Sequence, residues 1–235
     1  MKLLVLSDIH GNLAALRAVL AEPHDAVLCL GDLVGYGPRP ADCVAWARES
    51  GATVVAGNHD RTLTAGTHPG CRAAFLRLAE ATVCIGHEQV TGGDLAWLGE
   101  LPLRHCLALP ASTLLVHATP SDPLYRYLGP DAHEWELETA GQEAALFLVG
   151  HTHLQFEIDI GGKRVVNPGS VGLPKDGGPR AAYAVIDDVR VELKRAAYDV
   201  AETITQLAAS GLDARSVTEL SELLRTGSVP QSLRS

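Results

Sequence analysis

The chain has 235 residues, of which 46% are hydrophobic and 20% are charged. This is enough apolar material for a sizeable core, and no segment has the polar bias that would keep it unfolded, so we expect one domain over residues 1–235. The formal net charge of −9 argues against a stable nucleic-acid partner, because non-specific binding to nucleic acid depends on clustered Lys and Arg at phosphates.

Three strand–loop–helix units open the chain. Short apolar runs predict strands at Lys2–Leu6, Ala26–Leu30 and Thr53–Ala56. Apolar residues at helical spacing predict a helix from Leu13 to Leu20, and a second helix is expected at Pro40–Glu49, where the proline suits the first helical turn. Strands that alternate with helices indicate parallel pairing, so this part predicts an α/β sheet.

The middle of the chain, residues 64–105, gives the weakest signals. Its best helical segments are Cys71–Ala81 and Asp94–Leu101, and their ends are poorly marked. We expect this region to shape a cleft.

Short β-rich runs dominate the second half, and several are joined by tight turns that suit hairpins. A second sheet, more antiparallel than the first, follows from these runs. Two helices are then expected over about 199–226, the first capped by Asp199, and a polar tail follows. The predicted strands are His105–Leu109, Thr113–Val116, Ala145–Val149, Gln155–Ile160, Arg164–Val166, Ala182–Ile186 and Val189–Arg195.

The five cysteines are scattered and show no CxxC spacing, which fits a reducing cytoplasm better than a disulfide framework. The N-terminal apolar run Leu3–Leu6 is far shorter than the ~18 apolar residues of a spanning helix. We therefore expect a cytoplasmic protein with no membrane partner. The oligomeric state is not predicted.

Polar side chains suited to metals stand just after several predicted strands. In open α/β sheets ligands bind beyond the carboxyl ends of the strands, so these positions should converge although they are dispersed in sequence. Taken singly, each is more often a turn former or a cap. The residues concerned are Asp8, His10, Asp32, Asn58, His59, His117, His151 and His153.

The spacing of these residues points to metal chemistry. In an extended segment, alternate residues share a face, so Asp8 and His10 should aim the same way, as should His151 and His153. Such a mixed oxygen and nitrogen set suits manganese, iron, zinc or nickel better than calcium. Two cations ~3.5–4 Å apart can polarise a phosphoryl oxygen and lower the pKa of a bridging water, so hydrolysis is the expected reaction.

The sequence resembles the calcineurin-like metallophosphoesterase superfamily, and within it the small bacterial branch of YfcE-type phosphodiesterases. The resemblance rests on five blocks in the family's order, extended by the run from Asn167 to Gly172. These blocks are Asp8-Ile9-His10, Gly31-Asp32, Gly57-Asn58-His59-Asp60, His117 and Gly150-His151-Thr152-His153. The resemblance implies a four-layer α/β/β/α sandwich of two mixed sheets flanked by helices, in agreement with the two sheets inferred above.

The resemblance also implies a site for two divalent metal ions, manganese first, with iron, nickel or zinc as alternatives. It implies that Asp32 bridges the two. The remaining ligands would be Asp8, His10 and His153 for one metal and Asn58, His117 and His151 for the other.

The resemblance further implies that a water or hydroxide bridging the metals attacks a small phosphate ester. Diester and monoester, and a nucleotide or another small ester, remain open as substrates. His59 would contact the phosphate and protonate the leaving oxygen, and Asp60 could orient His59.

Two departures from the family pattern bear on function. The serine/threonine phosphatase branch carries Asp-Arg-Gly soon after the Gly-Asp block, whereas Leu33–Gly37 lacks it, which weakens a protein phosphatase role. His117 is followed by Ala118 and not by the more usual glycine. Two other functions remain open: a non-catalytic metal-binding scaffold, which the complete ligand set disfavours, and a polymer nuclease, which the acidic balance disfavours.

Several neighbouring residues are open to two interpretations. Tyr36 and Arg39 either serve a turn or face the cleft, and Asn167 and Ser170 are candidates to support the metal loops by hydrogen bonds. Asn12 is placed to cap the helix that starts at Leu13.

Overall fold

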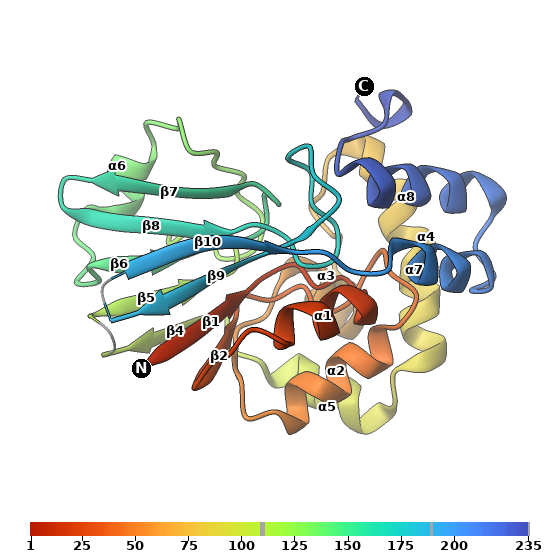
Figure 1. The fold of residues 1–235 in the computed structure, drawn as a ribbon, viewed down its shortest axis with the longest axis horizontal. Coiled ribbons are helices and arrows are strands. Elements are labelled where there is room, and N and C mark those ends of the chain that lie inside the picture. Colours follow the sequence, from red (N-terminus) through yellow and green to blue (C-terminus); the bar gives the residue numbers. More distant parts are fainter. Residues whose placement is uncertain (109–110, 189, 235) are drawn as a thin grey trace.

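The molecule contains two five-stranded β-sheets, which lie on one side of the view in Figure 1, while most of the helices lie on the other side. The computed structural model describes residues 1–108, 111–188 and 190–234. The first sheet has the order β10-β9-β1-β2-β3, with β1 (Lys2–Leu6), β2 (Ala26–Cys29), β3 (Thr53–Val54), β9 (Ala181–Asp187) and β10 (Arg190–Ala196). The second has the order β4-β5-β6-β8-β7, with β4 (Arg104–Leu107), β5 (Thr113–Val116), β6 (Leu146–Leu148), β7 (Gln155–Ile160) and β8 (Lys163–Pro168).

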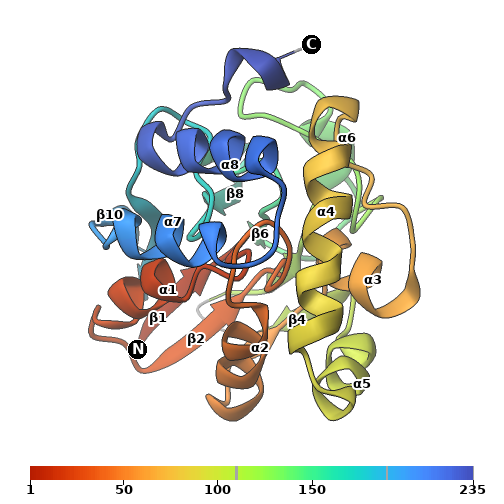
Figure 2. The same cartoon turned by 90° about the vertical axis from the view of Figure 1, so that its right-hand side faces the viewer.

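The helices lie mainly around one end of the strands and on the outer face of the first sheet (Figure 2). Helix α6 instead packs its Trp135 onto the outer face of the second sheet, beside Phe147 and Phe156. The predicted four-layer arrangement of two mixed sheets flanked by helices is thus confirmed. The helices are α1 (Leu13–Leu20), α2 (Pro40–Glu49), α3 (Asn58–Ala65), α4 (Ala73–Gln89), α5 (Gly92–Glu100), α6 (Trp135–Thr139), α7 (Val200–Ala208) and α8 (Ala214–Thr226), followed by a 3₁₀ turn η1 (Gln231–Leu233).

Alternation along β1 explains how the first sheet is covered on both faces. Leu3 and Val5 point into the apolar core between the two sheets, whereas Leu4 and Leu6 point into the core beneath α1 and α2. Such a fully buried strand reads as a continuous apolar run, as expected for a central strand of a covered sheet.

The pairing of the strands corrects one prediction. Among the described strands, each sheet has two parallel and two antiparallel pairings, so the second sheet is not the more antiparallel one. The error comes from β9 and β10, which join the first sheet, with Leu3 of β1 opposite Ile186 of β9. Six successive residues of β9 are buried, which suits a strand between two neighbours. A hairpin is a local feature, but the sheet that it joins is decided by distant contacts.

The helix predictions were accurate where caps and periodicity agree. Helices α1 and α2 have the predicted bounds, and the Asn12 side chain caps α1 by accepting from the Ala15 N–H at 3.1 Å, which confirms that interpretation. Helix α4 runs to Gln89, beyond the predicted end, and α3 and α6 were not predicted at all. Helix α3 was missed because its first residues, Gly57 to Asp60, resemble a turn.

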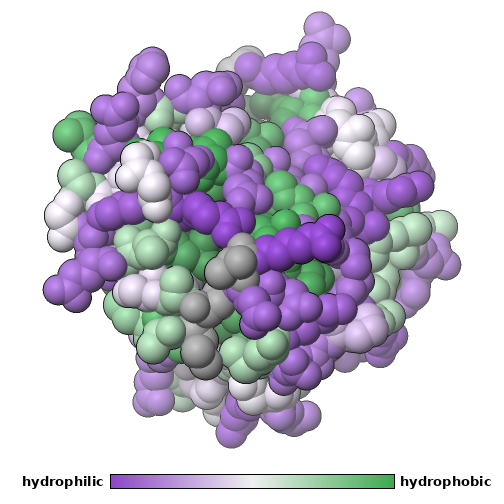
Figure 3. Space-filling view, turned by 60° about the vertical axis from the view of Figure 1, so that its left-hand side comes forward, coloured by the Kyte–Doolittle hydropathy of each residue, from purple (hydrophilic) through white to green (hydrophobic). Residues whose placement is uncertain are grey.

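The face of the molecule drawn in Figure 3 has a mixed surface. Hydrophilic residues cover much of the face shown in Figure 3, with apolar residues in small areas between them, as is ordinary for a protein surface. In the described part of the chain, no helix is both long and apolar enough to span a bilayer. Leu109 and Val189, which end or begin two predicted strands, lie outside the described residues.

Candidate metal centre

The eight candidate residues converge on one place, in the loops that follow the carboxyl ends of parallel strands and at the start of α3. Asp8 and His10 follow β1, Asp32 follows β2, and His117 follows β5. All eight are at most 5% exposed, although all are polar. Burial of so many polar groups is costly unless they are paired or bind a ligand, so their convergence requires an explanation.

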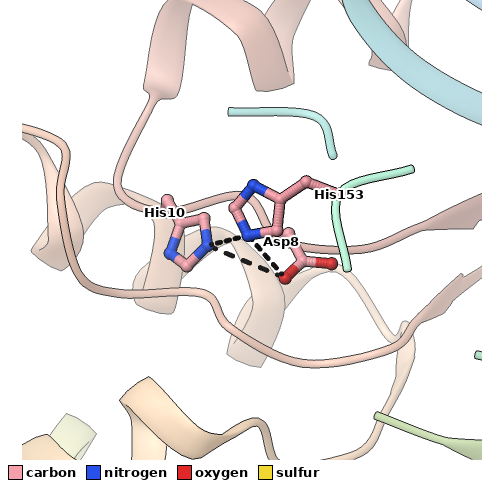
Figure 4. Close-up of side chains that lie close together, drawn as sticks. All are labelled: Asp8, His10 and His153. Carbon is pink, nitrogen blue, oxygen red and sulfur yellow. Dashed lines mark hydrogen bonds and ion pairs between the residues drawn. The ribbon is translucent and has the colours of Figure 1, made fainter. Parts of the chain in front are cut away.

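The first group brings together Asp8, His10 and His153 (Figure 4). The Nε2 atoms of His10 and His153 are 3.1 Å apart, and Oδ1 of Asp8 lies 3.3 Å from Nε2 of His153 and 3.7 Å from Nε2 of His10. The three ligand atoms therefore face one small space.

The second group is built around Asp32. Its Oδ2 atom lies 3.4 Å from Nε2 of His117 and 3.8 Å from Nε2 of His10, which places the Asp32 carboxylate between the two groups. Oδ1 of Asn58 lies 2.9 Å from the same His117 nitrogen. The His151 ring adjoins this group, with its centroid 5.0 Å from that of His117.

Backbone carbonyls orient the histidine rings. Nδ1 of His10 faces the Val34 carbonyl at 3.0 Å, Nδ1 of His117 faces that of Leu30 at 2.7 Å, and Nδ1 of His153 faces that of Leu173 at 2.5 Å. Each Nδ1–H therefore donates to a carbonyl, and each Nε2 is directed at the centre, which is the usual arrangement of a metal-binding histidine.

His151 is oriented the other way. Its Nε2 lies 3.3 Å from the Tyr125 carbonyl, so Nδ1 is the nitrogen free to act as a ligand.

The donor set fits a divalent cation. With Nδ1 protonated, the Nε2 atoms of His10 and His153 are both acceptors, yet they face each other and the Asp8 carboxylate across a few ångströms. Oδ1 of Asp8 is buried and has no hydrogen-bond donor in the described structure, whereas its Oδ2 accepts from Ser7 Oγ at 2.5 Å and from the His151 N–H at 3.0 Å. Lone pairs that converge without a donor are stabilised by a bound cation, and mixed carboxylate, amide and imidazole ligands suit a transition metal.

The protonation states agree with this role. Although burial raises the pKa of Asp8, attraction to His153 and His117 holds it well below its usual range. The pKa of Asp32 is likewise well below its usual range, because His117 and His59 outweigh the effect of burial. Burial lowers the pKa of His10 and brings that of His151 to about 3, so both rings are neutral ligands at neutral pH.

The pKa of His117 is shifted upward, in contrast to those of His10 and His151. Burial opposes its charge, but attraction to Asp32 raises the pKa of His117 to about 9. A cation bound at Asp32 would replace that proton.

Five candidate residues have left-handed backbone conformations, which corrects the expected reason for convergence. Alternation in an extended segment was expected to align Asp8 with His10 and His151 with His153, but all four have positive φ. Residues other than glycine pay strain there, and such strain concentrates at functional sites. The φ values are 53° for Asp8, 48° for His10, 55° for Asp32, 65° for His151 and 59° for His153.

Asp60 was expected to orient His59, but in the described residues the hydrogen bonds of its carboxylate go to backbone N–H groups. It accepts backbone N–H groups from Asp32, Leu33 and Gly57 at 2.9 Å each, and from Val34 at 3.3 Å. These bonds fasten the loop after β2 to the start of α3. Burial, followed by repulsion from Asp32, raises the pKa of Asp60 to about 7.

His59 lies at the centre, and its ring is buried. Its N–H donates to Oδ1 of Asp32 at 2.8 Å, while its Nδ1 is buried without a hydrogen-bond partner in the described structure. The ring packs against Tyr36, with centroids 4.6 Å apart, and burial lowers the pKa of His59 to about 4. His59 can also reach a shared ligand position with His10 and Asp32, so its place outside the metal shells stays a prediction.

Tyr36, Arg39 and Ser170, whose roles the sequence left open, have different surroundings in the structure. Tyr36 packs against His10 and His59, whereas the Arg39 guanidinium forms a double ion pair with Asp42 at 2.7 and 2.9 Å. Ser170 donates to the Asp8 carbonyl at 2.8 Å.

Asn167 supports the neighbouring histidine loop. Its side chain donates to the Gly150 carbonyl at 2.7 Å and to Thr152 Oγ1 at 3.1 Å. Asn167 and Ser170 thus hold the loops that carry Asp8, His151 and His153.

Two residues that the sequence did not single out also adjoin the centre. The Tyr127 ring stacks on His151 with centroids 3.8 Å apart. The Lys175 ammonium lies 4.5 Å from the Phe75 ring and 5.8 Å from that of Tyr36, and burial lowers the pKa of Lys175 to about 8. Lys175 stands three residues beyond the run that ends at Gly172, and this proximity is the one signal that could have found it.

The chain is similar to several known proteins. A family model described as a calcineurin-like phosphoesterase superfamily domain matches residues 1–189. An uncharacterised protein of Methanocaldococcus jannaschii is 30% identical over 231 residues, which cover 88% of this chain and 92% of that protein. Phosphodiesterase YfcE of Escherichia coli K12 is 28% identical over 195 residues, covering 80% of this chain and 88% of YfcE. A metallophosphoesterase from Sphaerobacter thermophilus is 32% identical, with a TM-score of 0.79 and coverage of 97% of this chain and 99% of that one.

Proposed function

The chain belongs to the calcineurin-like phosphoesterase superfamily, whose members are metal-dependent phosphoesterases, and we propose that it hydrolyses small phosphate esters at a centre of two divalent metal ions. The observation that carries the proposal is the set of buried lone pairs that converge without a donor. The proposed ligands are Asp8, His10, Asp32, Asn58, His117, His151 and His153, with Asp32 shared between the two ions.

The metals would supply the chemistry that the side chains lack. Two bound divalent cations, manganese first among the candidates, polarise a phosphoryl oxygen and make a water more acidic. The chain contributes a rigid frame, because carbonyls fix the rings of His10, His117 and His153 and Asp60 fixes the loop of Asp32. Such fixed ligands need little reorganisation during the reaction.

We assign His59 to the phosphate and the leaving oxygen. Its unpartnered Nδ1 and its nearness to Asp32 and His10 support this assignment. The neutral ring has one N–H that can donate to a phosphate oxygen, and a phosphate anion nearby favours the protonated ring that could act as a general acid.

His59→Ala tests this assignment. The variant should keep its metals, as measured by elemental analysis, and should lose about 10²–10⁴-fold in turnover of an alkyl phosphate ester, the range typical of a general acid. The loss should be smaller for the nitrophenyl ester of the same phosphate, because nitrophenolate leaves without protonation. His87→Ala, which changes an exposed histidine on α4, is the matched control.

Other outcomes would contradict the assignment or the function. Loss of a metal from the His59→Ala variant would make His59 a ligand, and equal losses on both esters would indicate phosphate positioning in place of proton donation. A metal-loaded wild-type protein that cleaves no ester would favour a non-catalytic scaffold.

A further inference from the structure

A cavity of about 390 Å³ opens beside the candidate metal centre. The start of α4, the loop that carries Tyr127, the loop after Thr152 and the C-terminal residues 229–234 all contribute to its walls. Its volume lies at the lower end of the ~300–1,000 Å³ found for small-molecule sites, so it suits one small molecule.

Two contacts connect the cavity to the candidate centre. Tyr127, on one wall, stacks on His151 at 3.8 Å between ring centroids. Lys175, on another wall, places its ammonium over Tyr36, and the Tyr36 ring in turn packs against His59. A phosphate held at the centre would therefore project its organic group into this cavity.

The charge of the cavity differs from that of the chain. The whole sequence has 28 acidic and 19 basic residues, yet the described residues that line the cavity include Arg72, Lys175 and Arg234 and no carboxylate. None of these three forms an ion pair with another described residue. Unpaired cations around a cavity favour an anionic occupant.

The three cations stand at different depths. Lys175 is partly buried and lies close to the aromatic rings of Phe75 and Tyr36, on the side of the centre. Arg72 and Arg234 are exposed and come from separate elements, so they lie at the rim. Lys175 is thus placed for the phosphate that reacts, and the two arginines for a second anionic group farther out.

Apolar side chains occupy the space between these positions. Phe75, Leu154 and Leu233 line the cavity together with the Tyr127 ring. They offer a surface for a ring or another apolar group, whose burial contributes roughly 25 cal/mol per Å².

We propose that this cavity selects phosphate esters whose organic part is a ring system carrying a second anionic group, of which a nucleoside bisphosphate is an example. The proposal rests on the proposed function, since it describes the substrate of the same centre. Arg72 and Arg234 are its specificity-determining residues. The proposal predicts a preference for esters that carry both a ring and a second anionic group, which the metal ligands alone would not produce.

The test compares three inhibitors of hydrolysis of a chromogenic ester, bis(p-nitrophenyl) phosphate, by the manganese-loaded full chain. They are adenosine 3′,5′-bisphosphate, adenosine 5′-monophosphate and propanediol bisphosphate, which lacks the ring. The adenosine bisphosphate should bind about tenfold more tightly than either of the others, the scale of one charged hydrogen bond or one buried ring.

The double variant Arg72→Gln with Arg234→Gln separates the cavity from the metals. Both side chains are exposed, so the variant should fold, and circular dichroism checks this. The preference for bisphosphate over monophosphate should fall toward one in this variant and persist in the control Arg225→Gln, an exposed arginine on α8 outside the cavity. An unchanged preference in the double variant, equal binding of the mono- and bisphosphate to the wild type, or stronger competition by a phosphoserine peptide would overturn the proposal.

A thermal-shift titration with the same three compounds keeps the two proposals distinguishable. If no ester is hydrolysed but the adenosine bisphosphate still stabilises the wild type more than the double variant, the proposed function fails, whereas Arg72 and Arg234 still bind the second anionic group. If esters are hydrolysed and the three compounds give equal shifts, the cavity proposal fails alone.

Discussion

Replacement of His153 by alanine and by glycine should reveal the backbone strain at the candidate centre. Both changes remove the imidazole, but alanine keeps a Cβ at φ 59°, a conformation that costs L-residues roughly 1–2 kcal/mol and costs glycine almost nothing. The greater freedom of glycine in the unfolded chain offsets part of this gain. The glycine variant should therefore be about 1 kcal/mol more stable than the alanine variant.

The same pair of changes at Asn58 is the matched control. Asn58 is also a proposed ligand, but it is the first residue of α3 and has no positive φ. With no left-handed strain to relieve, glycine only adds freedom to the unfolded chain and should be roughly 0.4–1 kcal/mol less stable than alanine, so the order of the two variants should reverse.

Urea unfolding of the metal-free proteins measures both differences, because lost metal then contributes nothing. With a slope of ~3 kcal/mol per molar urea, a difference of 1 kcal/mol moves the midpoint by about 0.3 M. If alanine were the more stable residue at both positions, the left-handed conformation of His153 would carry no strain and the reasoning would be refuted.

Three further predictions concern the same centre. Asp32→Ala should lose both metals, and elemental analysis that still finds one full equivalent would contradict a shared ligand. Asp60→Asn turns one acceptor oxygen into a donor that faces two backbone N–H groups. Each unsatisfied N–H costs ~1–3 kcal/mol, so the variant should lower the free energy of unfolding by about 2–6 kcal/mol. The control Asp131→Asn, at an exposed position, should leave it unchanged. Acidification of the metal-free protein from pH 7 to pH 5 should destabilise it. The pKa values of about 4 for His59 and about 3 for His151 mean that only the unfolded chain takes up these protons, so each of these two histidines contributes roughly 2 kcal/mol, and His10, whose pKa is also lowered, adds to the loss. The raised pKa values of Asp60 and His117 act in the opposite direction and offset part of it. Melting temperatures that rise on acidification would refute this last prediction.

The sequence was most informative where a signal is local. The bounds of β1, β5, β7, α1 and α2 were predicted correctly because periodicity, proline and a capping asparagine all act within a few residues. The sheet that β9 and β10 join could not be predicted, since it depends on contacts between Leu3 and Ile186, which lie far apart in the chain.

The candidate site was predictable in its residue types but not in its geometry. Aspartate, asparagine and histidine after apolar strands indicated a metal centre, yet nothing in Asp8-Ile9-His10 shows that both ends of the motif adopt left-handed conformations. Asp and His are enriched there relative to other residues, which is a weak signal. Lys175, Tyr127 and the C-terminal wall of the cavity belong to no motif. Only folding brings Tyr127 onto His151, Lys175 close to Tyr36, and all three to one cavity.

The contacts of Asp60 imply that the candidate bridging residue and the candidate proton donor are coupled. Asp60, on α3, accepts the N–H of Asp32, while Asp32 in turn accepts the N–H of His59 on the same helix. Loop and helix therefore hold each other, so Asp60→Asn should weaken metal retention and ester turnover together. His59→Ala keeps its backbone N–H to Asp32 and should affect turnover alone. Elemental analysis and rate measurements on both variants test this coupling. If Asp60→Asn retained both metals with wild-type affinity, other contacts would hold the loop, and Asp32 and His59 would not be coupled through Asp60.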